Sequence, residues 1–558
     1  MSKLLRSVTT LAGPVCALLV AAGCGAATPA AAPGAAPAAP DASAPVTPKV
    51  NRIVLATTAP AQESLEPRQL AGATSPQVRP MYEHLVGMDA KGGKFVPQLA
   101  TEWSGSADGK SWTFKLRKGV QFHQGYGEFP AKDLPQLINE YIRADSVGGW
   151  APYWKEYADS VEVVNDYEVV YHIKKTDGQF LQDVIEERAG NSVWSKKHFD
   201  AVGPNGLPYA GTGPYQFKER QQAVSIRFER VPYKHWRNTP DFPEFEFRWM
   251  KEASTRLAAL IAGEVQITDI PDDLQPQAVA KGMKVIPGQY PGLRVFISMY
   301  CCFHQDIKDR AKGWIDTPSP LKDVKVRKAL SKAINRAEMN KAFFNNKGLS
   351  MVLSHFHATR PGWNPDWEKR FPDEYGYDPA KAKQMLAEAG YGPGNPAGIN
   401  LVIEPVAGIP VGQDMTESIA SYFRAVGVNI NLLAIDPTEK ANGTRALRLT
   451  NHMNILTTGT TQWGSAYAYM GGITSRGSKV EIAPLDDLLD QLQLTADPQK
   501  QEELWRKAGD IYYANAGSIP LFWLPVEAVV NASIISQWVY PGGISGAWSH
   551  VDNIKAAR

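Results

Sequence analysis

Cysteine and histidine clusters are the first candidates for chemistry in this sequence, because their side chains bind metals or change redox state. Cys301 and Cys302 are adjacent, and His304 and Asp306 follow them closely. Neighbouring residues of a strand point to opposite faces, so two adjacent cysteines rarely bind one ion together. The pair is therefore expected to form either a vicinal disulfide in an oxidising compartment or a small buried pair at a strand end.

A second histidine pair, His355 and His357, would share one face of an extended strand. No cysteine or acidic residue nearby completes a set of metal ligands. We interpret these histidines as a loop or core pair. We therefore expect no metal site and no cofactor.

Two glycine-containing stretches imitate nucleotide-binding loops. In residues 104–111, Ser104 replaces the first glycine of a P-loop, and an alternating strand follows where phosphate binding needs a helix. The stretch with Gly211 and Gly213 lacks the third glycine of a dinucleotide fingerprint and has Pro214 at the turn. Both stretches are predicted to be turns. Because no nucleophile elbow and no His-Glu-x-x-His motif occur either, we expect no enzyme activity and no catalytic residue.

Composition narrows the class of protein further. The chain of 558 residues is 44% hydrophobic and 21% charged, which is enough for several folded units. Its 59 Lys and Arg nearly balance 57 Asp and Glu, so no global charge attracts nucleic acid or an anionic membrane. Four cysteines exclude a disulfide framework. The 15 Trp and 21 Tyr residues suit ligand surfaces as well as cores.

The N-terminal segment predicts export and tethering. Lys3 and Arg6 precede an apolar run over residues 11–22 that is too short to span a membrane, so residues 1–23 are interpreted as a signal peptide. The small residues before Cys24 resemble the bacterial lipobox, although Ala21 stands where that pattern prefers Leu. We expect lipidation at Cys24, with ordinary signal-peptidase cleavage as the alternative. Residues 24–50 are mostly Ala, Pro, Gly, Ser and Thr, which predicts a disordered linker.

Hydrophobic periodicity predicts both strands and helices in the body of the chain. Strands are expected over residues 52–56, 111–117 and 519–524, the second with Trp112, Phe114 and Leu116 on one face. Asp323, Asp378 and Asp497 each precede a segment with helical periodicity, so each is a predicted N-cap. Irregularly mixed helices and strands indicate an α/β fold with insertions.

Five sequence blocks, in order, resemble the extracytoplasmic solute-binding proteins of ABC importers, in the family 5 group of oligopeptide, dipeptide, opine and nickel binders. The similarity extends over about residues 51–548. The matching blocks are residues 99–123, 211–215, 326–336, 377–391 and 519–522.

The resemblance implies a two-lobed α/β fold, similar to the type II periplasmic binding proteins, with a hinge and an extra subdomain inserted in the first lobe. The ligand would bind in a cleft and close the lobes by a hinge motion. Strands near residues 293–299 and 520–525 would be the hinge crossings. By analogy, the first lobe comprises residues 51–86, 200–292 and 525–558. The inserted subdomain comprises residues 87–199, and the second lobe comprises residues 293–524.

One departure from the family pattern concerns the ligand. The peptide binders of the family carry a Trp-x-x-Asp-Tyr segment whose Asp pairs with the ligand α-ammonium, and here Ala466 occupies that place between Trp463 and Tyr467. Loss of one partner from such a buried pair costs roughly 3–5 kcal/mol. We hypothesise that a peptide with a free amino terminus is not bound in the usual way, unless an insertion shifts the register.

The resemblance also suggests ligand-binding residues. Trp463, Tyr467 and Tyr469 come from this segment, and Tyr82 comes from a similar first-lobe helix. Aromatic rings without a nearby fixed charge would suit a sugar, a blocked peptide or another amphiphilic solute.

The function implied is that of a lipid-anchored solute receptor in the periplasm or at the cell surface. It would capture a peptide or peptide-like solute as a monomer and deliver it to an ABC permease, whose ATPase is a separate chain. The alternatives are a nickel-chelate, opine or sugar binder of the same family, or a sensor that presents its ligand to a signalling partner. An exported hydrolase would need an activated nucleophile, which the sequence does not show.

Overall fold

The computed structural model describes residues 47–558 except 61–62, 71–74, 92–93, 182–190, 205, 291, 307–308, 316–317, 407–408, 410, 460–461, 472–478 and 543–547. The predicted signal peptide, Cys24 and most of the predicted linker lie outside the described residues. The chain divides into two units, Met1–Pro45 and Val46–Arg558, and the described residues all belong to the second. Among its described helices, none has the length and apolar character needed to cross a membrane.

The first large sheet has seven described strands in the order β12-β19-β11-β1-β10-β9-β8. The predicted strand β1 (Arg52–Thr57) is confirmed and pairs in parallel with β10 (Glu244–Trp249) and β11 (Ile267–Thr268). Val54 and Ala56 pack on α4, while Ile53 and Leu55 face the opposite core. The remaining elements of this sheet region are β8 (Tyr215–Gln221), β9 (Ser225–Arg230), β12 (Met283–Pro287), β19 (Glu527–Asn531), α4 (Ala253–Ile261) and α5 (Gln275–Ala280).

A smaller sheet is inserted in the sequence between β1 and β8. Its strands are β4 (Ala100–Gly105), β5 (Ser111–Leu116), β6 (Ala158–Asn165) and β7 (Glu168–Ile173), in the spatial order β4-β5-β7-β6. Trp112, Phe114 and Leu116 are buried together with Ile53 and Leu55, so one core serves both sheets. The neighbouring elements are β2 (Val86–Met88), β3 (Phe95–Pro97), α1 (Leu134–Ile142), α2 (Ala151–Tyr157) and α3 (Lys196–Val202). We call this sheet and the first large sheet, with their helices, the first lobe.

Both glycine-containing stretches are turns, as predicted. Residues 106–110 connect the antiparallel strands β4 and β5, and Gly109 has a φ of +66°. Gly213 donates its N–H to the carbonyl of Met81 at 3.0 Å, just before β8 begins. A Cβ atom at Gly211 would lie 2.0 Å from the Met81 oxygen, so this close backbone contact requires glycine.

The second large sheet has six described strands in the order β14-β18-β13-β17-β15-β16. The predicted strand β18 is confirmed and fully buried. The strands are β13 (Leu293–Tyr300), β14 (Leu349–Ser350), β15 (Gly398–Val402), β16 (Asn429–Leu433), β17 (His452–Thr458) and β18 (Ile519–Leu524). We call this sheet and its helices the second lobe.

Three helices of the second lobe begin where the sequence predicts. The carboxylates of Asp323, Asp378 and Asp497 accept the N–H groups of residues 325, 381 and 500, which confirms the three N-caps. The helices are α6 (Val324–Ala333), α7 (Arg336–Phe344), α8 (Asp366–Glu374), α9 (Pro379–Glu388), α10 (Gly412–Ala425), α11 (Pro437–Arg445), α12 (Gln462–Tyr469), α13 (Ala483–Gln493) and α14 (Pro498–Ala514).

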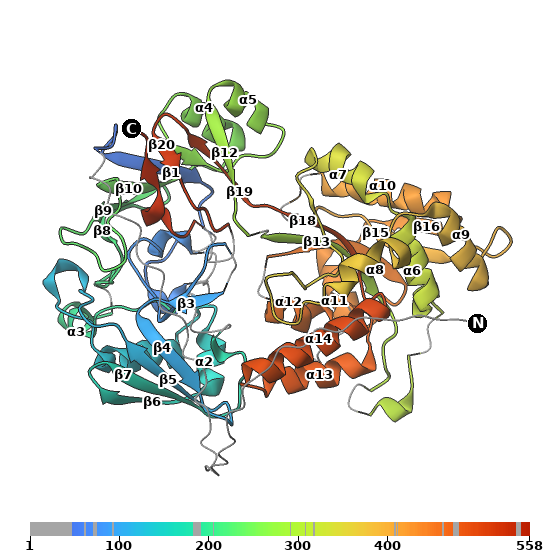
Figure 1. The fold of residues 1–558 in the computed structure, drawn as a ribbon, viewed down its shortest axis with the longest axis horizontal. Coiled ribbons are helices and arrows are strands. Elements are labelled where there is room, and N and C mark those ends of the chain that lie inside the picture. The colour runs from blue at the N-terminus through green and yellow to red at the C-terminus, as the bar shows by residue number, and fades with distance from the viewer. Residues whose placement is uncertain are drawn as a thin grey trace, which may run out of the picture. The chain divides into compact units, whose positions relative to one another are not determined.

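The chain passes between the two large sheets twice, from β12 to β13 and from β18 to β19 (Figure 1). β13 and β18 pair with each other in the second sheet, so the two crossings begin from neighbouring strands. After the second crossing, β20 (Ile535–Gln537) and β21 (Lys555–Ala556) form a small separate sheet. This arrangement agrees with a two-lobed α/β fold, and the residue boundaries assigned to each lobe stay a prediction.

Candidate functional site

The second sheet has two chemically different faces. Val295, Ile297 and Met299 of β13 are fully buried in an apolar core with residues of α6 and α10. Successive strand residues point to opposite faces, so the alternate residues of β13 lie on the other face beside their partners in β17. We call that second face the polar face; its residues are Arg294, Phe296, Ser298, Tyr300, His452, Asn454, Leu456 and Thr458.

The connections of the second sheet make one end of the polar face the candidate ligand site. β15 is parallel to both β16 and β17 and lies between them. The chain leaves β15 through α10 to β16 on one side and returns through α11 to β17 on the other. Ligands of such open α/β sheets bind beyond the carboxyl ends of the strands, where the connections diverge in this way.

A pocket of roughly 380 Å³ lies at this point. Glu404 follows β15, α11 follows β16, and α12 follows β17. We call it the strand-end pocket, and its volume is in the range of small-molecule sites. It is lined by Tyr300, Glu404, Lys440, Ala441, Thr444, Arg445, Leu456 and Tyr469.

A buried chain of hydrogen bonds holds Glu404 in the pocket wall. The hydroxyl of Tyr300 donates to Asn454 Oδ1 at 2.6 Å, and Asn454 Nδ2 donates to Glu404 Oε1 at 2.9 Å. Lys440 Nζ forms an ion pair with the same carboxylate oxygen. Burial and the nearby charge of Glu404 hold the pKa of Tyr300 above its usual range, so the phenol stays protonated and donates.

Tyr469 forms the aromatic side of the pocket and stacks on a buried histidine. The rings of Tyr469 and His355 are 5.9 Å apart and nearly parallel, and His355 Nδ1 shares a hydrogen bond with Ser465 Oγ at 2.6 Å. Phe296 of the polar face contacts Tyr469 edge to face, with ring centres 5.4 Å apart. Burial and the charge of Arg294 lower the pKa of His355 well below its usual value, so the ring is neutral.

The two histidines of the predicted pair lie in a loop, as expected. His355 is buried and has a φ of +74°, whereas His357 is half-buried against Tyr290 and Trp523. Burial, with the charges of Arg360 and Arg294, lowers the pKa of His357 to about 4. Within the described residues, no group of three or more His, Cys, Asp or Glu side chains could hold a metal ion.

The predicted ligand-binding residues are dispersed. Only Tyr469 lines the strand-end pocket. Trp463 is 6% exposed and packs on Tyr467 with ring centres 5.3 Å apart, and Ala466 is fully buried in the same core. Tyr82 is 3% exposed in the first lobe, where its hydroxyl donates to the Tyr209 carbonyl at 3.2 Å. A ligand role for these four aromatic residues stays a prediction.

Charged residues near Tyr469 were missed by sequence reasoning. The expectation of aromatic rings without a nearby fixed charge is wrong for Tyr469, because Glu404, Lys440 and Arg445 line the same pocket. The one signal in the sequence is that Glu404 comes directly after an apolar strand run, Leu401-Val402-Ile403. Polar residues at that position of an α/β strand are typical of ligand sites.

The lobes also contact each other away from the crossings. The Gly178 N–H of the first lobe donates to the Gln493 carbonyl at 2.6 Å, and Gln501 Nε2 donates to the Gly178 carbonyl at 2.7 Å. A Cβ atom at Gly178 would lie 1.9 Å from the Thr495 oxygen. Glycine at this position therefore permits the backbones of the two lobes to meet.

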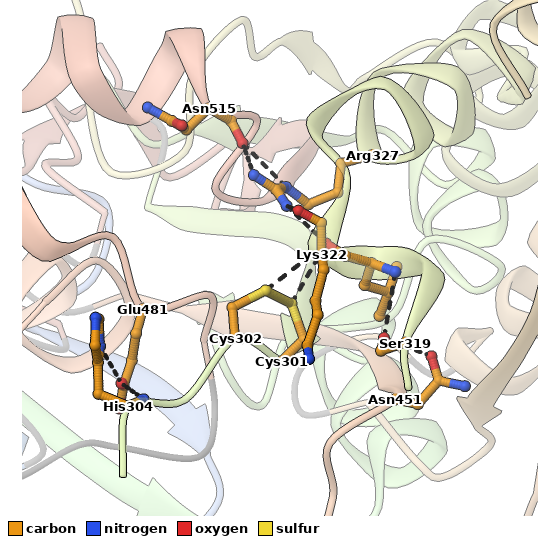
Figure 2. Close-up of a disulfide and its surroundings, with 10 residues drawn as sticks. Cys301, Cys302, His304, Ser319, Lys322, Arg327, Asn451, Glu481 and Asn515 are labelled. Atoms are coloured by element: carbon orange, nitrogen blue, oxygen red, sulfur yellow. Dashed lines mark hydrogen bonds and ion pairs between the residues drawn. A yellow bond between two sulfur atoms is a disulfide. The ribbon is translucent and has the colours of Figure 1, made fainter. Parts of the chain in front are cut away.

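Cys301 and Cys302 form a vicinal disulfide directly after β13 (Figure 2). The disulfide alternative is thus confirmed, and both cysteines are also buried. Their sulfur atoms lie 3.4 and 3.9 Å from the Leu321 carbonyl oxygen, which accepts a hydrogen bond from Arg327 Nη1 at 2.6 Å. A disulfide has no thiolate, so in this state neither cysteine can bind a metal through a thiolate.

Comparison with known proteins agrees with this architecture. Residues 94–479 match the family described as bacterial extracellular solute-binding proteins, family 5 Middle. The dipeptide-binding protein of Escherichia coli (strain K12) is 26% identical over 495 residues, which cover 83% of this chain and 87% of that protein.

Solved structures share the fold. HbpA2 from Haemophilus parasuis has a TM-score of 0.73 at 21% identity, covering 91% of this chain and all of that one. DppA from Helicobacter pylori, in complex with the peptide STSA, has a TM-score of 0.62 at 21% identity and covers 91% of this chain and 98% of that one. The predicted two-lobed α/β fold is therefore confirmed. The chain belongs to family 5 of the bacterial extracellular solute-binding proteins.

Proposed function

We propose that this protein is the substrate-binding component of an ABC importer and captures a peptide or peptide-like solute between its lobes. The observation that carries the proposal is the strand-end pocket, which combines aromatic and charged side chains at the point where α/β sheets bind ligands. The names of relatives add support, since the Escherichia coli relative is a dipeptide-binding protein and the Helicobacter pylori structure contains a peptide.

We further propose that Cys24 carries the lipid anchor and that residues 24–50 tether the folded body to a membrane. A spacer rich in Ala and Pro between an acylated cysteine and a folded domain would keep the receptor near its permease. In this proposal the protein acts as a monomer outside the cytoplasm. The protein would then deliver its solute to a permease whose ATPase subunits are separate chains.

The lobes would close on the solute about the two crossings. Tyr82 would come from the first lobe. In this proposal the first lobe comprises residues 51–86, 200–292 and 525–558, with the subdomain 87–199 inserted. The second lobe, 293–524, would supply Trp463, Tyr467 and Tyr469. The contact between Gly178 and Gln493 supports closure on the side away from the crossings, because it already joins the lobes.

The test is to identify the bound solute. The full-length chain, purified without denaturation, is analysed by native mass spectrometry, and any released compound is identified after unfolding. A released peptide, or binding of peptides by calorimetry, supports the proposal. A metal chelate, opine or sugar would overturn the peptide assignment, and binding of no solute from any of these classes would overturn the receptor function itself.

A further inference from the structure

We propose that the turn at residues 177–179 of the first lobe is a latch that holds the two lobes joined on the side away from the crossings. The turn docks on the end of α13 and the start of α14, and glycine at position 178 permits this docking. We call the turn and the residues that it contacts, 492–501, the interlobe latch. This inference rests on the proposed function, because it assigns closure of the receptor to a named contact.

The first lobe fixes the shape of the turn by itself. Asp177 is buried, and its Oδ1 accepts the N–H of Gln179 at 2.9 Å. Its Oδ2 accepts the hydroxyl of Tyr153, which belongs to α2. Phe180 follows and is fully buried in the core of the first lobe. The backbone at Gly178 is therefore held in position from both sides by its own lobe.

The second lobe presents the C-terminal end of a helix to this turn. Helix α13 ends at Gln493, and the carbonyls of a last helical turn lack partners within the helix. The Gly178 N–H donates to the Gln493 carbonyl at 2.6 Å. Gln179 Nε2 donates to the Leu492 carbonyl at 3.4 Å. In the other direction, Gln501 Nε2 of α14 donates to the Gly178 carbonyl at 2.7 Å. The turn of one lobe therefore caps a helix of the other lobe.

The contact with the second lobe explains why position 178 holds glycine. A Cβ atom there would lie 1.9 Å from the Thr495 oxygen and 3.0 Å from the Leu492 oxygen. Both atoms belong to the second lobe. The φ of Gly178 lies outside the left-handed region, so its own backbone conformation suits any residue. An alanine at this position would therefore fit the first lobe and would clash with the second when the lobes are joined.

The latch can control affinity without contacting the solute. The strand-end pocket is lined by other residues of the second lobe. A solute that is held between two lobes binds with an affinity proportional to the fraction of molecules in which the lobes can join. Weakening the latch lowers that fraction, so the apparent affinity should fall although every residue of the pocket is unchanged.

The test is Gly178→Ala in the full-length chain. Hydrogen–deuterium exchange is measured with and without the dipeptide Ala-Phe as the probe. Exchange in the segments 177–180 and 492–497 should be at least about tenfold faster in the variant than in the wild type when the probe is present, because the interlobe hydrogen bonds are lost. Calorimetry should show at least about tenfold weaker binding of Ala-Phe. Gln501→Ala removes one donor of the latch and should weaken binding by about threefold.

The matched control is Gly394→Ala. A Cβ atom at Gly394 would meet nothing within 4 Å, and its φ also lies outside the left-handed region. The control should keep the wild-type exchange and affinity, and circular dichroism should show that all three variants are folded. If Gly178→Ala and Gln501→Ala both exchange like the wild type in the two segments, the latch is wrong while the receptor function stands. If the wild type fails to bind Ala-Phe but binds a solute of another class, the peptide assignment fails. The latch is then judged with that solute, and unchanged exchange in the two variants would overturn it as well.

Discussion

The two faces of the second sheet are built from the same strands but hold different chemistry. On one face, Val295, Ile297 and Met299 are fully buried against apolar helices. On the other, Tyr300 and Asn454 form a hydrogen-bonded chain that ends at Glu404. Alternate residues of β13 therefore have different roles: those on the apolar face stabilise the core, and those on the polar face support the pocket. A substitution on β13 should affect mainly one property, according to the face that it alters.

The largest effect is expected on the apolar face. Ile297→Ala removes a fully buried side chain from the core and should lower the free energy of unfolding by about 2–5 kcal/mol. Urea denaturation measures this loss. The affinity of the remaining folded protein for its solute should be unchanged by calorimetry. The matched change on the polar face, Ser298→Ala, should cost no more than about 1–2 kcal/mol. Equal losses of unfolding free energy in Ile297→Ala and Ser298→Ala would contradict the distinction between the two faces.

On the polar face, Tyr300→Phe should reduce both stability and binding. The substitution removes the donor to the buried Asn454 Oδ1, which costs about 1–3 kcal/mol. It also loosens the support of Glu404 in the wall of the strand-end pocket, so the affinity for the solute should fall. Denaturation and calorimetry on the same samples separate the two effects. Tyr469→Phe is the control for stability and should change the free energy of unfolding by less than about 0.5 kcal/mol, because Tyr469 lies half-exposed in the pocket wall.

Acidification should weaken the fold through His355. Burial and Arg294 hold its folded-state pKa well below the value of about 6.5 expected for the unfolded chain. The unfolded state thus binds a proton that the folded state excludes. This contribution to stability is complete above pH 6.5 and is lost as pH falls below it, by up to about 1.4 kcal/mol per pH unit. Denaturation curves between pH 7.5 and 5 should show a smaller slope in His355→Gln. An unchanged slope would contradict this assignment.

The smallest effect on stability is expected for Lys440→Gln. The Lys440–Glu404 pair borders the pocket, and ion pairs of this kind contribute about 1 kcal/mol or less. A loss of more than about 2 kcal/mol in unfolding free energy would show that the pair belongs to the core and not to the site.

The sequence predicted local structure better than the site, for physical reasons. The strands over β1, β5 and β18 and the caps at Asp323, Asp378 and Asp497 depend on neighbouring residues, whose pattern is visible in the chain. The pocket depends on residues distant in sequence: Tyr300 and Asn454 are 154 positions apart, and Asn454 and Glu404 are 50 apart. The resemblance of the aromatic segment to the family pattern indicated Tyr469 as a candidate. The spatial order of the strands is needed to place Glu404 beside it.

The most direct test of the claim that the polar face binds the solute is hydrogen–deuterium exchange, with and without saturating peptide. We predict slower exchange in the segments 403–406, 437–445 and 452–458 and in α12, with no change in α6 and α10, which cover the apolar face. Protection confined to α6 and α10, or equal on both sides of the sheet, would contradict the assignment of recognition to the polar face.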